Sequence, residues 1–265
     1  MTTVSNFVQV RLMPSARKVM PSTAWPIWAS ARNRTQATAK IGHGGIEKGL
    51  WLALFLFVGA STPTRLSGQT LQPGAAEALS AIPVKGRAPK SGYARDQFGQ
   101  AWSQEDSDGC DTRNRVLQRD LIVTAIRAGT SGCVVLRGQL FDPYSGLVVP
   151  FERGLASSVV QIDHVVSLSN AWQTGAFQWT FDKRETFAND VLNLLAVSGR
   201  LNQQKRDGDA ATWLPPRKGY RCAYVARQIA VKRKYGLWVT PPEQGAIQRI
   251  LLGCPGQKLP VEPPS

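Results

Sequence analysis

The chain has 265 residues and a formal net charge of +14, and its large apolar and aromatic residues become frequent only after about Tyr93. This distribution leaves little material for a second core and predicts one domain in the C-terminal two thirds. The excess charge is concentrated between Arg200 and Lys234, where ten Lys or Arg stand against two Asp, which favours nucleic acid as a partner ahead of an anionic membrane surface; a solvated basic face is the alternative.

Three segments are expected to precede the domain. Residues 1–48 form a basic extension that is either disordered or a sign that translation starts further along the chain. Residues 49–60 contain the apolar run LWLALFLFVGA, which is too short to span a bilayer comfortably and matches a signal-peptide core. An uncleaved membrane anchor is the alternative. Residues 61–92 are rich in Ser, Thr, Pro and Gly and predict a flexible linker.

The expected domain spans residues 93–255, and a disordered tail is expected over 256–265. The four cysteines all follow the apolar run, which favours two disulfides in a secreted or extracytoplasmic protein. Three pairings are possible, and local loops favour Cys110 with Cys133 and Cys222 with Cys254. The absence of a CxxC pair argues against a structural zinc site.

Two segments predict β-structure. The stretch CVVLRGQLFDPYSGLVVPF has apolar runs on both sides of Asp142–Gly146, where Pro and Gly favour a turn, so it predicts a β-hairpin. In SSVVQIDHVVSL the β-branched residues predict a strand that runs into Asp163 and His164.

Three helices are expected toward the C-terminus. Ser198 can cap a short helix from about Gly199 to Arg206. The stretch YRCAYVARQIAVKRKYG predicts an amphipathic basic helix that stops at Gly236. A capping box from Thr240 to Glu243, with Pro at the first helical position, predicts the last helix.

His164 is one of two histidines in the chain, and its neighbour Asp163 makes the pair a candidate for phosphodiester hydrolysis. This reaction needs an activated water, a cation to stabilise charge on the phosphoryl oxygens, and a means of holding the strand. A neutral imidazole can accept the proton of water, and carboxylate and amide oxygens suit Mg²⁺. Neighbours on a strand point to opposite faces, so the pair serves one site only where the strand bends or ends.

The succession of QIDHVVSLSNAW, FANDVLNLLAVSGRLNQQKRDGD and WLPP resembles the HNH nucleases, and more closely the secreted branch related to the C-terminal domain of GmrSD-type restriction proteins. The resemblance runs from about Gly109 to Cys254 and includes GCDTRNRVLQRDL, the DPYSG turn and YRCAYVARQIAVKRKYGL. It implies an α+β fold with a ββα-metal core, in which a hairpin and a helix hold one divalent cation, with an added hairpin, C-terminal helices and two disulfides.

Residue by residue, the resemblance implies that His164 is the general base and Asp163 a metal ligand. Asn193 matches the residue that braces the loop between the strands and helps to orient the base. Asn202 matches the last ligand of the motif, and its amide oxygen favours Mg²⁺ or Mn²⁺ over softer ions. Lys205 is expected on the same helix face as Asn202, where it could hold a phosphate.

The expected phosphate- or DNA-binding residues are Lys205, Arg206, Lys232, Arg233 and Lys234. Each site residue also has an ordinary structural alternative: a packed histidine, a capping carboxylate, a loop or surface asparagine, a solvated lysine. Asp190 and Asp207 could support the site, although capping and charge balance explain them equally well.

The resulting expectation is a secreted endonuclease that uses Mg²⁺ (or Mn²⁺) and hydrolyses DNA with little sequence preference, because no base-reading module is evident. The alternatives are a non-catalytic nucleic-acid-binding envelope protein and a cationic membrane-anchored protein. DNA against RNA, single against double strands, and the oligomeric state stay open.

Overall fold

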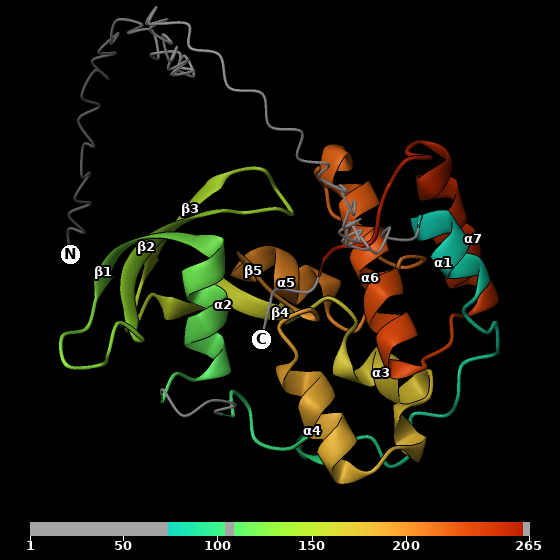
Figure 1. Ribbon diagram of the computed structural model, residues 1–265, viewed down its shortest axis with the longest axis horizontal. Coiled ribbons are helices and arrows are strands. Elements are labelled where there is room, and N and C mark those ends of the chain that lie inside the picture. Colours follow the sequence, from blue (N-terminus) through green and yellow to red (C-terminus); the bar gives the residue numbers. More distant parts are fainter. Residues whose placement is uncertain (1–73, 104–108, 262–265) are drawn as a thin grey trace, which may run out of the picture. The chain divides into compact units, whose positions relative to one another are not determined.

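The computed structural model describes residues 74–103 and 109–261. The expected basic extension (1–48), the expected signal-peptide core (49–60) and residues 61–73 of the expected linker lie outside the described residues. The described part has an α+β fold with two antiparallel sheets and a helical layer (Figure 1). Within it, no helix is both long enough and apolar enough to cross a membrane.

The first sheet contains the predicted hairpin. Its strands are β1 (Leu121–Ile126), β2 (Val135–Phe141) and β3 (Val148–Glu152), in the order β1-β2-β3 with antiparallel pairing. The turn between β2 and β3 is closed by Asp142, whose carboxylate accepts from the backbone nitrogen and the hydroxyl of Ser145, and by Gly146 at φ 79°. The DPYSG stretch thus forms the predicted turn.

The second sheet and the helix after it form a ββα unit. Strand β4 (Val160–His164) pairs antiparallel with β5 (Leu194–Ser198), and α5 (Gly199–Lys205) follows β5 directly. A Cβ at Gly199 would lie 2.1 Å from the carbonyl oxygen of Ser158, so only glycine allows this close approach. The ββα arrangement expected from the motifs is therefore present.

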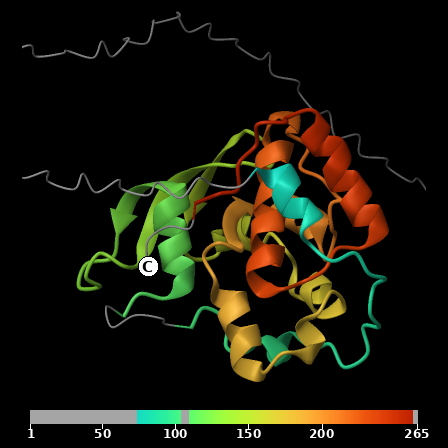
Figure 2. The ribbon, with the colours of Figure 1, turned by 45° about the vertical axis from the view of Figure 1, so that its right-hand side comes forward.

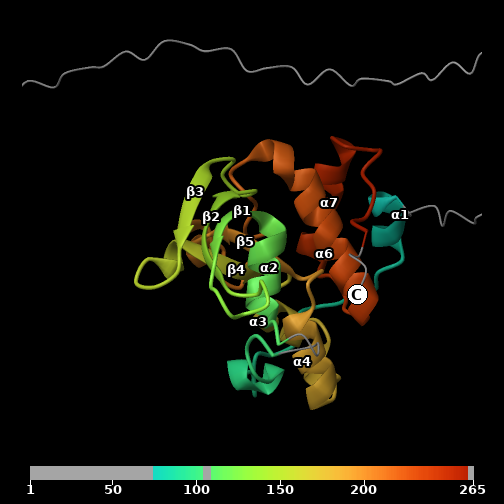
Figure 3. The ribbon, with the colours of Figure 1, turned by 60° about the vertical axis from the view of Figure 1, so that its left-hand side comes forward.

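Helices surround this unit. Helix α2 (Thr112–Asp120) packs on both sheets through a small core that includes Val116, Leu117 and Leu140 (Figure 3). Between β4 and β5 the chain forms α3 (Leu168–Gln173) and α4 (Phe181–Asn189). The short 3₁₀ segments are η1 (Arg95–Phe98), η2 (Ser157–Val159), η3 (Ala176–Gln178) and η4 (Lys218–Tyr220).

The helical layer lies on the side of the ββα unit opposite the first sheet (Figures 1 and 2). It contains α1 (Ala75–Ser80), α6 (Arg221–Tyr235) and α7 (Pro241–Leu252). As predicted, α6 ends at Gly236 in the left-handed conformation, and α7 begins with the Thr240–Glu243 capping box and Pro241.

The expected flexible linker over 61–92 is wrong for residues 74–82. Ala75, Ala78 and Leu79 of α1 and the following Ile82 are buried in the main core, and α1 contacts both α6 and α7. The expected disordered tail is likewise wrong for residues 256–261, because Lys258 pairs with Gly74 in a β-bridge and Leu259 is buried. Small alanine side chains at helical spacing fill the narrow space between helices, which a search for large apolar residues overlooks.

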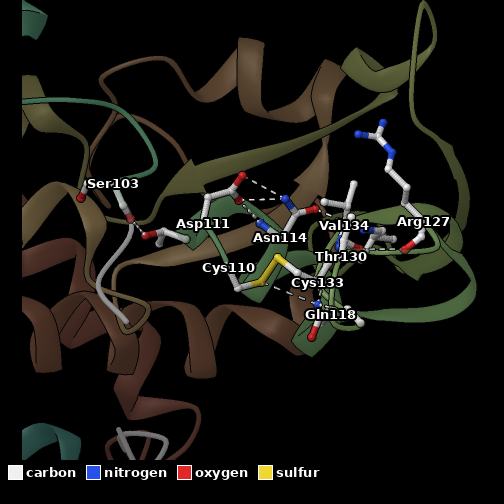
Figure 4. The surroundings of a disulfide bond; sticks show 12 residues. Ser103, Cys110, Asp111, Asn114, Gln118, Arg127, Thr130, Cys133 and Val134 are labelled. Carbon is white, nitrogen blue, oxygen red and sulfur yellow. Dashed lines mark hydrogen bonds between the residues drawn. A yellow bond between two sulfur atoms is a disulfide. The ribbon is translucent and has the colours of Figure 1, made fainter. Parts of the chain in front are cut away.

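Both preferred disulfide pairings are confirmed. Cys110 and Cys133 join the start of α2 to the loop before β2, and Cys222 and Cys254 join the start of α6 to the end of α7. Figure 4 shows the first bridge, where the Gln118 amide donates to the Cys133 carbonyl at 2.6 Å. Each bridge closes a local loop and contributes roughly 3 kcal/mol by limiting the unfolded chain.

Candidate active site

The end of β4 places Asp163 and His164 at one site. Strand β4 ends at His164, and the chain turns into α3, whose first turn is capped by the Ser167 hydroxyl. Asp163 and His164 are 4% and 9% exposed, and both line a cavity of about 250 Å³ together with Asn202 of α5. The condition that the strand must end at this pair is met, so a carboxylate, an imidazole and an amide share one cavity.

Asp163 is held by two long-range contacts. Lys205 Nζ donates to Asp163 Oδ1 at 2.9 Å and to the His164 carbonyl oxygen at 2.8 Å. The Tyr144 hydroxyl, from the turn between β2 and β3, donates to Asp163 Oδ2. Burial raises the pKa of Asp163, and the charge and hydrogen bond of Lys205 and the hydroxyl of Tyr144 oppose that rise.

Lys205, which was expected to hold a phosphate, is ion-paired inside the protein. Its side chain is fully buried, and its ammonium is paired with Asp163. The position on the same helix as Asn202 was predicted correctly, but the lysine points into the protein, because a buried carboxylate at Asp163 requires a compensating charge. Lys205 therefore positions Asp163 from inside the protein.

A hydrogen bond sets the tautomer of the His164 ring. Its Nε2 lies 2.8 Å from the Ala188 carbonyl oxygen, and since a carbonyl only accepts, Nε2 carries the hydrogen and Nδ1 is an acceptor in the neutral ring. Burial lowers the pKa of His164 to about 3, against the bond to Ala188, which raises it. The imidazole is therefore neutral near neutral pH, the form that a general base needs, and the same low pKa makes it a weak base.

The two asparagines lie in different environments. Asn193 is fully buried, and its amide accepts from the Val166 nitrogen at 2.8 Å and donates to the Val166 oxygen at 3.2 Å. It thus ties the turn after β4 to the segment before β5, and its part in catalysis stays a prediction. The Asn202 amide nitrogen donates to Gln161 Oε1 at 3.0 Å, which places its oxygen on the opposite side of the amide.

The expected basic residues divide into three groups. Arg206 is exposed, lines the cavity and has φ 50° at the end of α5, an uncommon conformation for a residue with a side chain. Lys232 is wrong as a phosphate contact because it is 0% exposed and pairs with Glu243. Lys234 pairs with Asp190. Arg233 is exposed at the end of α6, and its role stays a prediction.

Two residues of the site were missed from the sequence. Tyr144 was interpreted only as part of a turn, and its contact with Asp163 spans 19 positions. Arg95 of η1 lines the cavity with Arg206, although it lies outside the main basic cluster and carries no motif. Its place at the beginning of the expected domain was the only available indication.

The residues at the cavity fit one hard divalent cation. Among the described residues, no group of three or more His, Cys, Asp and Glu side chains could hold a metal. Asp163 and Asn202 supply a carboxylate and an amide oxygen, and Mg²⁺ binds through one or two such ligands while keeping several waters. Each carboxylate oxygen of Asp163 has two lone pairs, and the hydrogen bond from Lys205 to one oxygen and from Tyr144 to the other leaves capacity for a ligand bond.

Fold and site thus define an α+β domain whose ββα unit carries a neutral histidine beside a carboxylate and an amide. Residues 111–250 match the family described as GmrSD restriction endonucleases, C-terminal domain. The chain belongs to this family, which indicates a nuclease-type function. It is also 41% identical over 178 residues to an "Uncharacterized secreted protein" of Arthroderma benhamiae, covering 66% of this chain and 82% of that protein. No solved structure matches the chain. The secreted relative agrees with the expected extracytoplasmic location.

Proposed function

We propose that the protein is a secreted endonuclease that hydrolyses phosphodiester bonds of DNA with little sequence preference and requires Mg²⁺ or Mn²⁺. The observation that carries the proposal is the neutral His164 ring in a cavity shared with Asp163 and Asn202. The family indicates a nuclease, and the two disulfides and the secreted relative support export.

In the proposed reaction, Arg95 and Arg206 bind phosphates of the strand at the cavity. His164 Nδ1 takes a proton from a water molecule, the water oxygen forms a bond to phosphorus, and the bond from phosphorus to the 3′ oxygen breaks. The 3′ oxygen takes a proton from solvent, and the other product keeps a 5′-phosphate. Asp163 and Asn202 would hold the cation, which stabilises negative charge on the phosphoryl and leaving oxygens.

The remaining residues prepare this geometry. Lys205 and Tyr144 fix the two oxygens of Asp163, and the Ala188 carbonyl fixes the tautomer of His164. Asn193 holds the turn after β4 through Val166. The site is thus built mainly on strand ends and one helix, which positions its groups more firmly than a free loop.

The test is to incubate the purified protein with plasmid DNA in Mg²⁺ or Mn²⁺, with and without EDTA, beside the His164→Ala variant. The proposal predicts nicking and linearisation that stop in EDTA and in the variant. DNA binding without cleavage in either metal would overturn it and would support the non-catalytic alternative. Parallel incubation with RNA decides whether the protein cleaves DNA alone or both nucleic acids.

A further inference from the structure

A second cavity of about 250 Å³ adjoins the candidate active site. It shares Arg95, His164 and Leu168 with the first cavity, so His164 stands between the two. The first cavity is bordered by polar groups such as Asp163 and Asn202. The second is otherwise lined by Asp96, Phe98, Gly99, Ala101, Trp102 and Ala188. One side of the histidine is therefore polar, and the other is apolar and aromatic.

We infer that this second cavity receives one unpaired nucleobase of the substrate, next to the phosphate that is cut, so that the protein prefers single strands. The inference rests on the proposed function, because it places the sugar-phosphate chain in the first cavity. The two parts of a nucleotide match this division. The phosphate needs charge and hydrogen bonds, whereas a base that has left a stack needs an apolar pocket and a ring to stack on.

Trp102 is the ring that the cavity offers. Its indole is half-buried and lies nearly parallel to the imidazole of His164, with an interplanar angle of 18° and ring centroids 6.5 Å apart. Its backbone has φ 62°, a conformation that is costly for a bulky residue and that persists only where the surroundings enforce it. Asn189 of α4 supplies this constraint, because its side chain accepts from the Ser103 nitrogen and donates to the Gln100 carbonyl.

Phe98 forms the wall of the second cavity that belongs to the protein core. It is 1% exposed and packs against Trp172 and Phe187 of the main core, so this wall does not depend on a bound ligand. The cavity is thus backed by the core and bordered by one half-buried indole, and it reaches His164 directly. Such a pocket is preformed, which reduces the cost of ordering on binding.

The lining also fits the weak sequence preference of the proposed function. Every nucleobase has a π-face, so stacking on Trp102 tolerates all four bases. A base in a duplex can enter only after it is unpaired and unstacked, which costs free energy that a single strand does not have to supply. We therefore expect a single-stranded oligonucleotide to be cut about ten-fold faster or more than the same sequence in a duplex.

The experiment uses a labelled single strand, its duplex, and single strands with one abasic position moved along the sequence. Cleavage at a given phosphate should fall about ten-fold or more when the abasic position lies beside it, and little when it lies elsewhere. Trp102→Ala should cause a similar fall on the intact strand. The two changes together should cost no more than either alone, because both remove the same stacking contact.

Trp102→Phe keeps an aromatic face and should retain most of the single-strand preference. Trp238→Ala is the matched control, since this tryptophan is also half-buried and its indole nitrogen donates to the Gly86 carbonyl, and neither residue lines the two cavities. The stabilities of Trp102→Phe and Trp238→Ala are compared by thermal melting. The control should lower stability without changing the ratio of single-strand to duplex cleavage.

Equal cleavage of single strand and duplex, or additive effects of Trp102→Ala and the abasic position, would overturn the inference while leaving the nuclease function in place. Absence of cleavage on every substrate in Mg²⁺ and Mn²⁺ would overturn the proposed function instead. In that case, binding measured in EDTA tests separately whether the second cavity receives a base. Fluorescence anisotropy should show that the wild type binds the abasic strand more weakly than the intact strand, and that Trp102→Ala binds both equally.

Discussion

Two buried lysines of this chain form nearly the same ion pair in different settings. Lys205 lies 2.9 Å from Asp163, and Lys232 lies 2.9 Å from Glu243, with all four side chains at most 5% exposed. Each lysine also donates to a backbone carbonyl, of His164 and Trp238 respectively. Charge, burial and distance are thus almost equal in the two pairs.

The carboxylates differ in their other neighbours. Glu243 accepts from the Thr240 nitrogen and completes the cap of its own helix, so the pair with Lys232 joins α6 to α7. Asp163 accepts from Tyr144 and lines the cavity that contains His164 and Asn202. A buried ion pair is therefore a weak indication of function by itself. The cavity beside the carboxylate and the imidazole next to it make the difference.

The matched variants Asp163→Asn and Glu243→Gln test this difference most severely. Each leaves a buried ammonium without its counter-charge, so each should lower the free energy of unfolding by about 3–5 kcal/mol. Only Asp163→Asn should abolish cleavage at any practical Mg²⁺ concentration, because it removes the charged ligand. Urea unfolding and cleavage rates at a temperature where both variants are folded provide the measurement. Equal loss of activity in both would mean that the two pairs do not differ in kind.

His164→Ala should reduce the cleavage rate by about 10²–10⁴-fold, since a general base contributes that much. The melting temperature should fall moderately, because the ring is buried and bonded to Ala188. Binding of DNA in EDTA should be retained. A variant that cleaves at the wild-type rate would remove His164 from the mechanism and leave the cavity beside Asp163 without a base.

Asn202→Ala should be partly rescued by more metal, because the amide contributes a neutral ligand and Asp163 remains. Asn202→His should keep activity and shift the preference toward Mn²⁺, Ni²⁺ or Zn²⁺, for which imidazole is the better ligand. Initial rates against metal concentration for each ion check both expectations. If Asn202→Ala matches the wild type at low Mg²⁺, another oxygen is the second ligand.

Tyr144→Phe tests the contact of Asp163 that Glu243 lacks, which is the hydrogen bond from a tyrosine hydroxyl. Removing the hydroxyl leaves Asp163 Oδ2 without its donor, and loss of such a supporting hydrogen bond typically weakens metal binding by about 10–100-fold. The rate at saturating metal should change less. Unaltered Mn²⁺ affinity would show that Lys205 alone suffices to position the carboxylate.

The smallest expected effect comes from the two exposed arginines that line the first cavity, Arg95 and Arg206. Replacing both with Gln should lower the slope of log affinity against log salt by about 1.4 on single strands, on the basis of roughly 0.7 for each phosphate contact. Fluorescence anisotropy in EDTA over a salt series measures the slope. Arg233→Gln is the comparison, as Arg233 is exposed at the end of α6; a larger change there would move the substrate path away from the cavity.

Local rules predicted those elements whose causes lie within a few residues. The stop at Gly236, the Thr240–Glu243 cap and the turn at Asp142–Gly146 need only neighbouring backbone and side chains. The ββα unit and the residues Asp163, His164 and Asn202 came from the motif resemblance, and the structure brings these three to one cavity.

The errors concern side chains whose partners lie far along the chain. A lysine is ordinarily expected at the surface, and nothing near Lys205 reveals that Asp163, 42 positions away, requires its charge. Lys232 failed for the same reason, with Glu243 on the next helix. Helix α1 was missed because its buried face is mainly alanine, which composition alone does not distinguish from a linker.

Electron paramagnetic resonance of Mn²⁺ tests the central claim most directly, because it counts free and bound ions without any substrate. The wild type, Asp163→Asn and Glu243→Gln are titrated under identical conditions, at a temperature where all three are folded. The account predicts one bound ion per chain in the wild type and in Glu243→Gln, and loss of that ion in Asp163→Asn. Binding in Asp163→Asn equal to that of the wild type would contradict it.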